Sequence, residues 1–514
     1  GAFGTIKAHD VGDRHGLRAR FLTLIAIIGP GLIVMVGDND AGGVSTYAQA
    51  GQNFGYTLLW TLPLLIPVLI INQEMVARLG AVTGVGHGRL IRERFGKYWG
   101  NVSISSILLL NFLIIITEFI GISLSMEYFG VSPYISVPIA VIVLFCVTAS
   151  GTFQRWERFM MLFVAINFVI VPLVIVTKPH FSSLVSHSVI PGIRGGASSA
   201  AVLLIISIIG TTVAPWQLYF QQSNIVDKKI TPRWLNYERV DTIIGSLIVV
   251  VGAALMIGVA AAGLAGHGNT NSYTNALGVA RGLSHYVGKG SGTLFAILLL
   301  NASVIGAAAV TLASTYALGD LGASRHSLNA RVRDAKGFFG SFAGLLVVAG
   351  IVTLLPGAPL GLITLAVQAM CGLMLPSTTI FVLLLCNDRE VLGPWVNGKW
   401  LNVAATIIVS VLVVLSITMM VSTLFTSINV LVLLSTLGVV VGIGLVIGLP
   451  IGLKRAAVKI EYNIDKRDWR TPRLTLLAPL PTSLARRILL RAVGSYLLVA
   501  GTLLVVRIVQ LATS

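Results

Sequence analysis

Twelve long apolar runs fill most of this chain, and they leave few folds open to it. Charged residues make up only 11% of its 514 residues, against about 25% in soluble domains. A bilayer admits only structures whose backbone groups are paired internally, namely helices and closed barrels. The runs lack the regular alternation of apolar and polar residues that a membrane barrel requires. The sequence therefore predicts an all-α integral membrane protein.

Each run is long enough to cross the hydrocarbon core, which takes about 20 apolar residues. The expected spans are 21–52, 57–82, 100–128, 132–150, 158–176, 198–223, 242–265, 292–319, 338–355, 358–386, 401–424 and 428–453. A thirteenth run, 492–511, contains Arg507. It could cross the membrane or lie on its surface.

Basic residues are concentrated in alternate loops between the runs. The net charge of +17 could indicate a nucleic-acid partner, but this distribution follows the positive-inside rule of membrane proteins. The rule places the N-terminus in the cytoplasm, with the stretches 89–97, 228–233, 325–336 and 454–473. We therefore expect a multi-pass protein of the cell membrane without a nucleic-acid partner. The sequence leaves its oligomeric state open.

Two aspartates, Asp38 and Asp40, stand in the middle of the first run, in VGDNDAGG. A charge inside the bilayer is costly and usually functional. Glycine weakens a helix, and Asp and Asn compete for its backbone groups. The pattern favours a helix break within the membrane, although a surface loop between two short helices would also explain it.

A second break is predicted in the sixth run, where Gly210, Thr211, Thr212 and Pro215 lie at the centre. Proline inside a helix removes a hydrogen bond and clashes with the preceding turn. Interrupted helices at corresponding positions of two halves are typical of transporters built on inverted repeats. The unwound backbone offers carbonyl groups, which suit a cation.

The other acidic residues within the apolar runs give weaker evidence of a functional role. Glu74 lies four residues before Arg78, which predicts a structural ion pair. Glu127 is near the end of its run and could face water. Glu118 is deeper, and a structural hydrogen bond or a role in a transport pathway would both explain it. All eight histidines fall outside the expected spans, so the usual nitrogen ligand of transition metals and a common proton relay are both missing there.

Six stretches of the chain resemble the NRAMP family of divalent-metal transporters. They are GPGLIVMVGDNDAGG, NFGYTLLW, QEMVARLGAVTG, TEFIGISLSMEYFG, GTTVAPWQLY and QAMCGLMLP, within roughly residues 20–450. The resemblance implies the inverted-repeat (5+5) fold of the amino-acid–polyamine–cation superfamily, with helices 1 and 6 broken. The expected organisation is a cytoplasmic N-terminus (1–20), a transporter core with spans 1–5 and 6–10 as repeats (21–386), additional spans (387–453), and a basic cytoplasmic tail with a hydrophobic segment (454–514).

The chain departs from the family pattern at the metal-binding motifs. The family has Asp-Pro-Gly-Asn in the first span, and here Asp40 is kept while the asparagine is Gly43. The family has Met-Pro-His in the sixth span, and here Ala214 and Trp216 flank the proline. These changes remove a thioether ligand and a proton-linked histidine. They are similar to those of the NRAMP-related magnesium transporters.

Two further helices match the family in part. Glu118 matches its glutamate in the third span, but Ile115 replaces an acid that many members have. In the tenth span, Met374 stands where a glutamine often lines the site. The resemblance implies metal contacts from Asp40, Gly43, Thr211 and Ala214, with Asp38, Asn39, Glu118, Trp216 and Gln368 in an outer shell or along the pathway.

Magnesium is small, hard and slow to lose water, so its sites need oxygen ligands and room for water. Gly43 and Ala214 would give that room, and the lost sulfur would disfavour soft metals. The expected function is secondary transport of Mg²⁺, with Mn²⁺ as second substrate, by alternating access without proton coupling. The alternatives are a proton-coupled Mn²⁺ or Fe²⁺ transporter and an amino-acid transporter on the same fold. Without an HExxH or GxSxG motif, we expect neither an enzyme nor a cofactor beyond the transported metal.

Overall fold

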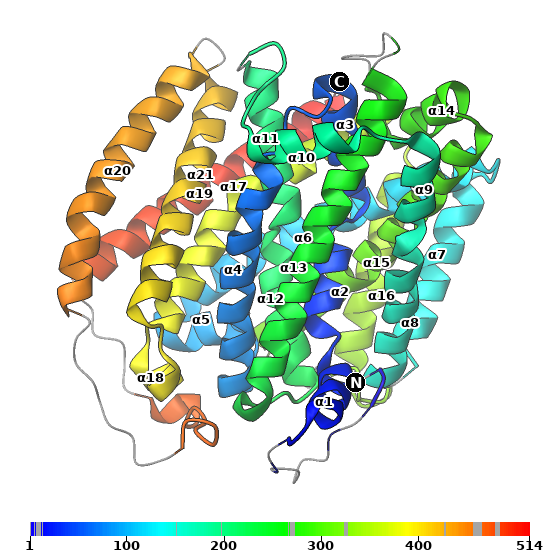
Figure 1. The fold of residues 1–514 in the computed structure, drawn as a ribbon. Coiled ribbons are helices and arrows are strands. Elements are labelled where there is room, and N and C mark those ends of the chain that lie inside the picture. Colours follow the sequence, from blue (N-terminus) through cyan, green and yellow to red (C-terminus); the bar gives the residue numbers. More distant parts are fainter. Residues whose placement is uncertain are drawn as a thin grey trace.

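The computed structural model describes residues 2–4, 6, 12, 14–150, 152–196, 198–265, 267, 273–322, 327–425, 428–455, 465–477 and 484–513. In these residues the regular structure is entirely helical (Figure 1). Ten segments of this part of the chain are long and apolar enough to cross a membrane, and one bent helix pair raises the number to eleven. The prediction of an all-α integral membrane protein is confirmed.

A helix lies at each of the twelve predicted spans, but the one at 132–150 has 16 residues and is shorter than the candidate spans. The first five spans correspond to α1 (Leu17–Ile27), α2 (Pro30–Gly37) and α3 (Ala41–Phe54), α4 (Thr61–Thr83), α6 (Lys97–Tyr128), α7 (Pro133–Thr148), and α8 (Phe153–Ile166) with α9 (Ile170–Thr177). The next five correspond to α11 (Ser199–Thr212) and α12 (Pro215–Asp227), α13 (Leu235–Ala260), α15 (Lys289–Gly322), α16 (Lys336–Thr353) and α17 (Leu360–Cys386). The last two are α19 (Lys399–Leu424) and α20 (Val430–Arg455).

Shorter helices connect or flank these spans. They are α5 (His87–Phe95), α10 (Phe181–Val189), α14 (Ala276–Tyr286) and α18 (Arg389–Leu392). Three of them contain a histidine from outside the expected spans, namely His87, His187 and His285. His9 and His326 lie outside the described residues. The described histidines are all outside the candidate spans, as the sequence predicts.

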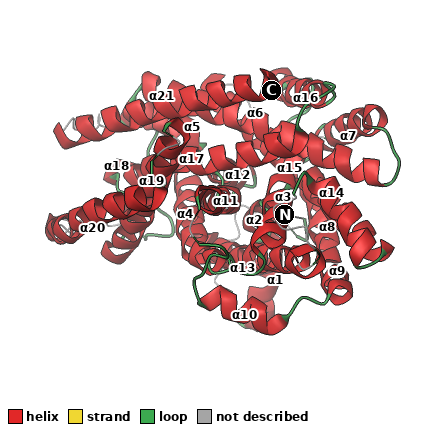
Figure 2. Ribbon diagram, turned by 90° about the horizontal axis from the view of Figure 1, so that it is seen from above, coloured by secondary structure: helices red, strands yellow, loops and turns green. Residues whose placement is uncertain are grey.

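The broken helices lie at the centre of the molecule. Seen from above, α2, α3, α11 and α12 are surrounded by α4, α6, α13, α15 and α17 (Figure 2). The surrounding helices hold them closely, because α13 packs along α2 and α3, α17 packs along α11, and α4 packs along α12. Helices α7, α10 and α20 lie at the periphery. Buried polar groups of the central helices are thereby kept away from lipid.

The C-terminal run forms part of α21 (Leu484–Thr513), which crosses obliquely beside α17 (Figures 1 and 2). Its buried residues Val493, Leu497 and Ala500 recur at helical spacing and mark the packed face. The run at 492–511 is therefore part of a helix that packs against α17.

The first span bends once more than the sequence analysis expected. Between α1 and α2 the axis turns by 53°. Gly29 has a φ of +149°, a conformation that favours glycine, and Pro30 begins α2. Lys228 donates to the carbonyls of Ile27 and Ile28 at 2.6 and 3.1 Å, and Asp241 accepts from the N–H groups of α2, which include Gly31 at 2.8 Å. Side chains from elsewhere in the fold thus form hydrogen bonds with the polar backbone groups at this bend.

Candidate metal site at the two helix breaks

Asp40 is the N-cap residue of α3. Its backbone is extended, and its Oδ1 accepts a hydrogen bond from the N–H of Gly43 at 2.8 Å. Aspartate is among the preferred residues at this position, where its charge faces the positive end of the helix dipole. The side chain is 2% exposed. The predicted break in the first span therefore exists, and it places a carboxylate deep inside the protein.

Glu118 of α6 meets the same turn of α3. Its Oε2 accepts a hydrogen bond from the N–H of Ala41 at 3.1 Å. Gly306 of α15 makes the approach possible, because a Cβ there would overlap Oε2 of Glu118 and lie 2.9 Å from Cβ of Asp40. The two acids thus lie next to each other where α3, α6 and α15 meet.

Asp38 lies on the other side of the break and lacks the neighbours that Asp40 has. Both of its carboxylate oxygens are buried, and neither has a hydrogen-bond partner of good geometry in the described part of the chain. The Gln217 side chain of α12 faces this carboxylate. The amide of Asn39 donates to the carbonyl of Val249 at 3.3 Å, while its Oδ1 is buried without a partner among the described residues. Such oxygens normally contact water or an ion.

The two breaks come together at Gly43. A Cβ on Gly43 would lie 2.8 Å from the backbone carbonyl oxygen of Asp38 and 3.3 Å from Oγ1 of Thr211. That hydroxyl oxygen is also buried without a partner in the regions described. The space beside Gly43 is therefore filled by oxygen-bearing groups, where the sequence argument expected open volume for water.

The second break lies at Val213 and Ala214, between α11 and α12. Ala214 is buried and extended at the N-cap of α12, and its carbonyl accepts from the N–H of Gln217 at 3.2 Å. Pro215 then begins α12 and needs no donor at that position. The predicted break in the sixth span is thus confirmed, with a main-chain carbonyl at its end.

Trp216 and Gln368 form part of the wall around the breaks. The Trp216 ring would lie 3.6 Å from a Cβ on Gly37, and its Nε1 is buried without a partner in the described ranges. The Gln368 amide of α17 lies directly against Gly42, where a Cβ would overlap it. Both side chains therefore border the segment that contains Asp38 and Asp40.

Several residues of this region were missed by the sequence analysis. They are Tyr47 of α3, which shares a hydrogen bond of 2.8 Å with Thr212 of the predicted second break, and Gln73 of α4, which donates to Gln217 at 2.9 Å. Uncharged amides and hydroxyls within apolar runs were the available signal, since they are costly to bury without partners. Cys371 of α17 is within electrostatic range of both aspartates; it belongs to the stretch QAMCGLMLP, from which the sequence analysis singled out only Gln368 and Met374.

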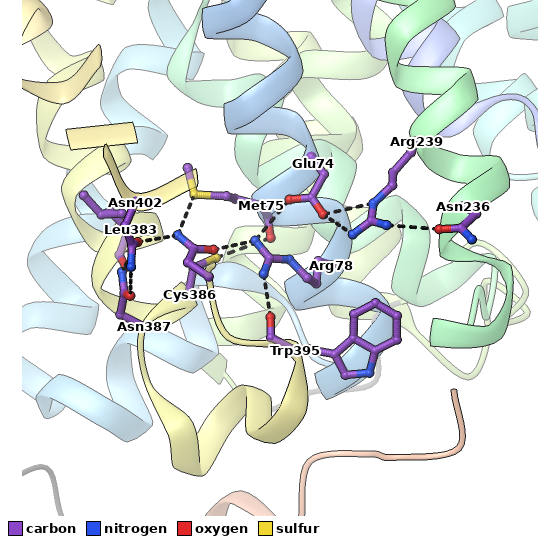
Figure 3. A network of polar contacts seen from close by, with 11 residues as sticks. Glu74, Met75, Arg78, Asn236, Arg239, Leu383, Cys386, Asn387, Trp395 and Asn402 are labelled. Atoms are coloured by element: carbon purple, nitrogen blue, oxygen red, sulfur yellow. Dashed lines mark hydrogen bonds and ion pairs between the residues drawn. The ribbon is translucent and has the colours of Figure 1, made fainter. Parts of the chain in front are cut away.

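Glu74 belongs to a different network, as its spacing from Arg78 predicts. It pairs with Arg78 at 3.0 Å and also with Arg239 of α13 at 2.7 Å (Figure 3). Glu127 forms an exposed pair with Arg281 at 3.3 Å. Neither acid takes part in the candidate metal site.

The site offers a cation mainly oxygen ligands. Carboxylate, amide, hydroxyl and carbonyl oxygens all occur at the breaks, which are the ligands of Mg²⁺ and similar hard ions. The described residues contain no cluster of three or more His, Cys, Asp or Glu that could hold a metal. A cavity of about 30 Å³ adjoins Asn39, Val44 and Tyr47, which is enough for about one water.

Comparison with known proteins gives consistent matches over most of the chain. The family model described as natural resistance-associated macrophage protein-like (Nramp) matches residues 31–422. The divalent metal cation transporter MntH of Aeromonas hydrophila is 25% identical over 404 residues, covering 76% of this chain and 94% of that protein. MntH of Bacillus subtilis is 27% identical over 432 residues, covering 78% and 93%. The Eremococcus coleocola manganese transporter is structurally similar, with a TM-score of 0.61, 21% identity, and coverage of 88% of this chain and 100% of that one.

Proposed function

The chain belongs to the Nramp family, and from this premise we propose that it transports divalent metal cations across the membrane, with Mg²⁺ as its main substrate and Mn²⁺ as its second. The family match spans residues 31–422, which include both helix breaks. Members of such a family are transporters and not enzymes. Alternating access would carry the ion past the breaks between α2 and α3 and between α11 and α12.

The observation that supports magnesium is the unpaired state of Asp38. Both of its oxygens are buried without a hydrogen-bond partner of good geometry among the described residues, and Asn39 Oδ1 and Thr211 Oγ1 at the two breaks are likewise buried without partners there. A hydrated Mg²⁺ ion would satisfy these acceptors through its waters, because it usually keeps several of them when bound. Asp40 would supply the fixed negative charge. Gly43 and Ala214 add no side-chain ligand, so the thioether that would favour softer metals is missing from the second break.

We propose Mn²⁺ as the second substrate because sites made of hard oxygen ligands also accept this ion. Relatives of this chain include a manganese transporter and proteins named divalent metal cation transporters. An amino-acid substrate fits less well. Its carboxylate would need the helix N-terminus that Asp40 already occupies, and the two negative charges would repel each other.

We infer further that transport is not coupled to protons. Trp216 and Ile115 occupy two positions where a titratable group would serve coupling, and the described spans contain no histidine. Glu118 remains as an acid near the pathway, but it accepts the N–H of Ala41. That contact gives it a structural task that needs no proton transfer.

The test is uptake into liposomes that contain the purified protein and a pH-sensitive dye. We expect Mg²⁺ and Mn²⁺ entry above that of liposomes containing Asp40→Asn, with no acidification beyond leak. Ca²⁺ should enter more slowly, because it prefers six to eight protein or water oxygens at longer distances. Mn²⁺ uptake without Mg²⁺ uptake would refute the magnesium assignment. Acidification that follows metal entry would refute uncoupled transport.

A further inference from the structure

We propose that a phospholipid with an anionic head group binds in the crevice between α17, α19 and α20, with its head group beside Lys399. This site is separate from the helix breaks and does not rest on the transported ion. The crevice is a cavity of about 480 Å³, within the range of about 300–1,000 Å³ that holds small organic ligands.

The lining of the crevice changes from polar to apolar along the helices. Lys399 and Asn402 belong to the first turn of α19, and Asn387 follows the last residue of α17. Deeper along the same helices the lining is mostly aliphatic, with Leu383 of α17 and Leu445 of α20. A phospholipid has the same order of chemistry, with a polar head group at the membrane edge and acyl chains below it.

The charge at the polar end fits an anion. Lys399 is exposed, has no ion pair in the described part of the chain, and no acidic residue lines the crevice. The neighbouring Trp400 is 84% exposed, and tryptophan is enriched at the level of lipid head groups. The positive-inside pattern assigns this end of α19 to the cytoplasmic leaflet, whose anionic lipids attract basic residues.

Glycines on α20 keep the crevice open. Gly444 and Gly448 line it one helical turn apart, and a Cβ on either would meet nothing within 4 Å. Small residues in membrane helices usually allow another helix to approach closely, but here no described atom fills the space. Only 6% of the α20 span is buried inside the protein, and the helix stands at the edge of the molecule (Figure 1). An acyl chain would fit into this gap.

The amide pair at the crevice is held in a fixed position. Asn387 and Asn402 exchange hydrogen bonds of 2.8 and 2.6 Å, and Asn397 donates to Asn402 at 2.9 Å. Asn397 in turn accepts a hydrogen bond of 2.6 Å from Arg78, and Arg78 forms an ion pair with Glu74 (Figure 3). The polar end of the crevice is therefore a hydrogen-bonded network that reaches Arg78 of α4.

The test is native mass spectrometry of the full-length protein titrated with phosphatidylglycerol and, separately, phosphatidylcholine. We expect wild type to retain phosphatidylglycerol preferentially, and Lys399→Gln to lower that preference about fivefold, the effect of one lysine near an anionic surface. Lys336→Gln is the matched control, since Lys336 is also an exposed first residue of a spanning helix but does not line the crevice. It should leave the preference unchanged.

The double variant Gly444→Leu with Gly448→Leu fills the crevice without touching Lys399. It should reduce retention of both lipids while the elution volume and melting temperature stay those of wild type. The proposal is overturned if Lys399→Gln retains phosphatidylglycerol like wild type, or if Lys336→Gln weakens it equally. It is also overturned if inorganic phosphate displaces the lipid at millimolar concentration, because the site would then recognise a phosphate ion. Should the double variant misfold, the two lysine variants still decide the outcome.

Discussion

Glu118 of α6 accepts a hydrogen bond of 3.1 Å from the backbone N–H of Ala41, immediately after Asp40. An N–H group in the first turn of a helix has no partner within the helix. A side chain from the third span therefore completes the cap of α3, to which Asp40 contributes through Gly43. The two neighbouring acids have different tasks, since Glu118 secures the helix start and Asp40 faces the break.

Replacing Glu118 should separate the capping task from a role in proton transfer. Glu118→Gln keeps an oxygen acceptor for Ala41, so its melting temperature and Mg²⁺ uptake should remain close to wild type. Glu118→Ala leaves a buried N–H unpaired, which costs about 1–3 kcal/mol, and should unfold at lower temperature. Thermal unfolding in detergent and uptake into liposomes provide the readout. Loss of uptake in Glu118→Gln at unchanged stability would contradict the structural role.

Asp40 allows the charge to be removed while the helix cap is kept. Asparagine is as good an N-cap residue as aspartate, whereas alanine loses about 0.5–2 kcal/mol. We therefore expect Asp40→Asn and Asp40→Ala to reduce Mg²⁺ uptake to the leak level, with only Asp40→Ala showing a lower melting temperature. If Asp40→Asn transported Mg²⁺ at the wild-type rate, the metal assignment of Asp40 would be wrong.

His87 makes the stability of the protein depend on pH. Burial lowers the pKa of His87 to about 4, and the hydrogen bond with Gln222 only partly opposes that shift. The unfolded chain, with a histidine pKa of about 6.5, therefore binds more protons between these values. Stability is present above about pH 6.5 and is lost as the pH falls towards 4, by up to about 3 kcal/mol.

Melting temperatures measured across that interval test the role of His87. Wild type should lose more stability on acidification than His87→Gln, because glutamine has no proton to bind. His285→Gln is the control, since His285 is exposed on α14, and its pH profile should follow that of wild type. Equal acid sensitivity of His87→Gln and wild type would show that other groups cause the loss.

Hydropathy and helix-breaking residues predicted the spans and both central breaks, because these features are local in sequence. The bend at Gly29 was not predicted. Gly-Pro-Gly is a local signal for a bend, but the side chains that stabilise this one, Lys228 and Asp241, come from distant parts of the sequence. The position of α21 also depends on tertiary packing, as its contact with α17 shows. Hydropathy alone does not distinguish such a helix from a further span.

The membership of the candidate metal site stays a prediction, whereas the geometry of the breaks is seen only in the structure. The resemblance and the breaks indicated Asp40, Thr211 and Ala214, and the structure brings both breaks together at Gly43. Sequence could not predict that the Asp38 carbonyl occupies the space beside Gly43, because that contact depends on how α2 and α3 meet. For the same reason it could not place Cys371 near the aspartates.

This geometry decides how the selectivity of the site should be tested. Gly43→Asn, the change that would restore the family motif, places its Cβ 2.8 Å from a backbone oxygen and would strain the break. Ala214 is the better position, since it is buried at the second break and its carbonyl can stay in place. Ala214→Met adds a thioether, and Ala214→Leu adds similar bulk without sulfur. Methionine should raise Cd²⁺ and Mn²⁺ uptake relative to Mg²⁺, because a soft ligand favours softer metals.

Leucine should reduce Mg²⁺ uptake without that gain, because it removes room for bound water and offers no ligand. Competition of Cd²⁺ and Mg²⁺ against Mn²⁺ uptake, measured for wild type and both variants, separates size from softness. Misfolding could lower every rate, but it would not raise the uptake of one ion relative to another. If both variants keep the wild-type order of ions, Ala214 does not contribute to selectivity. Cys371→Ser would then be the next variant to measure, because its thiol is a sulfur group within electrostatic range of Asp38 and Asp40.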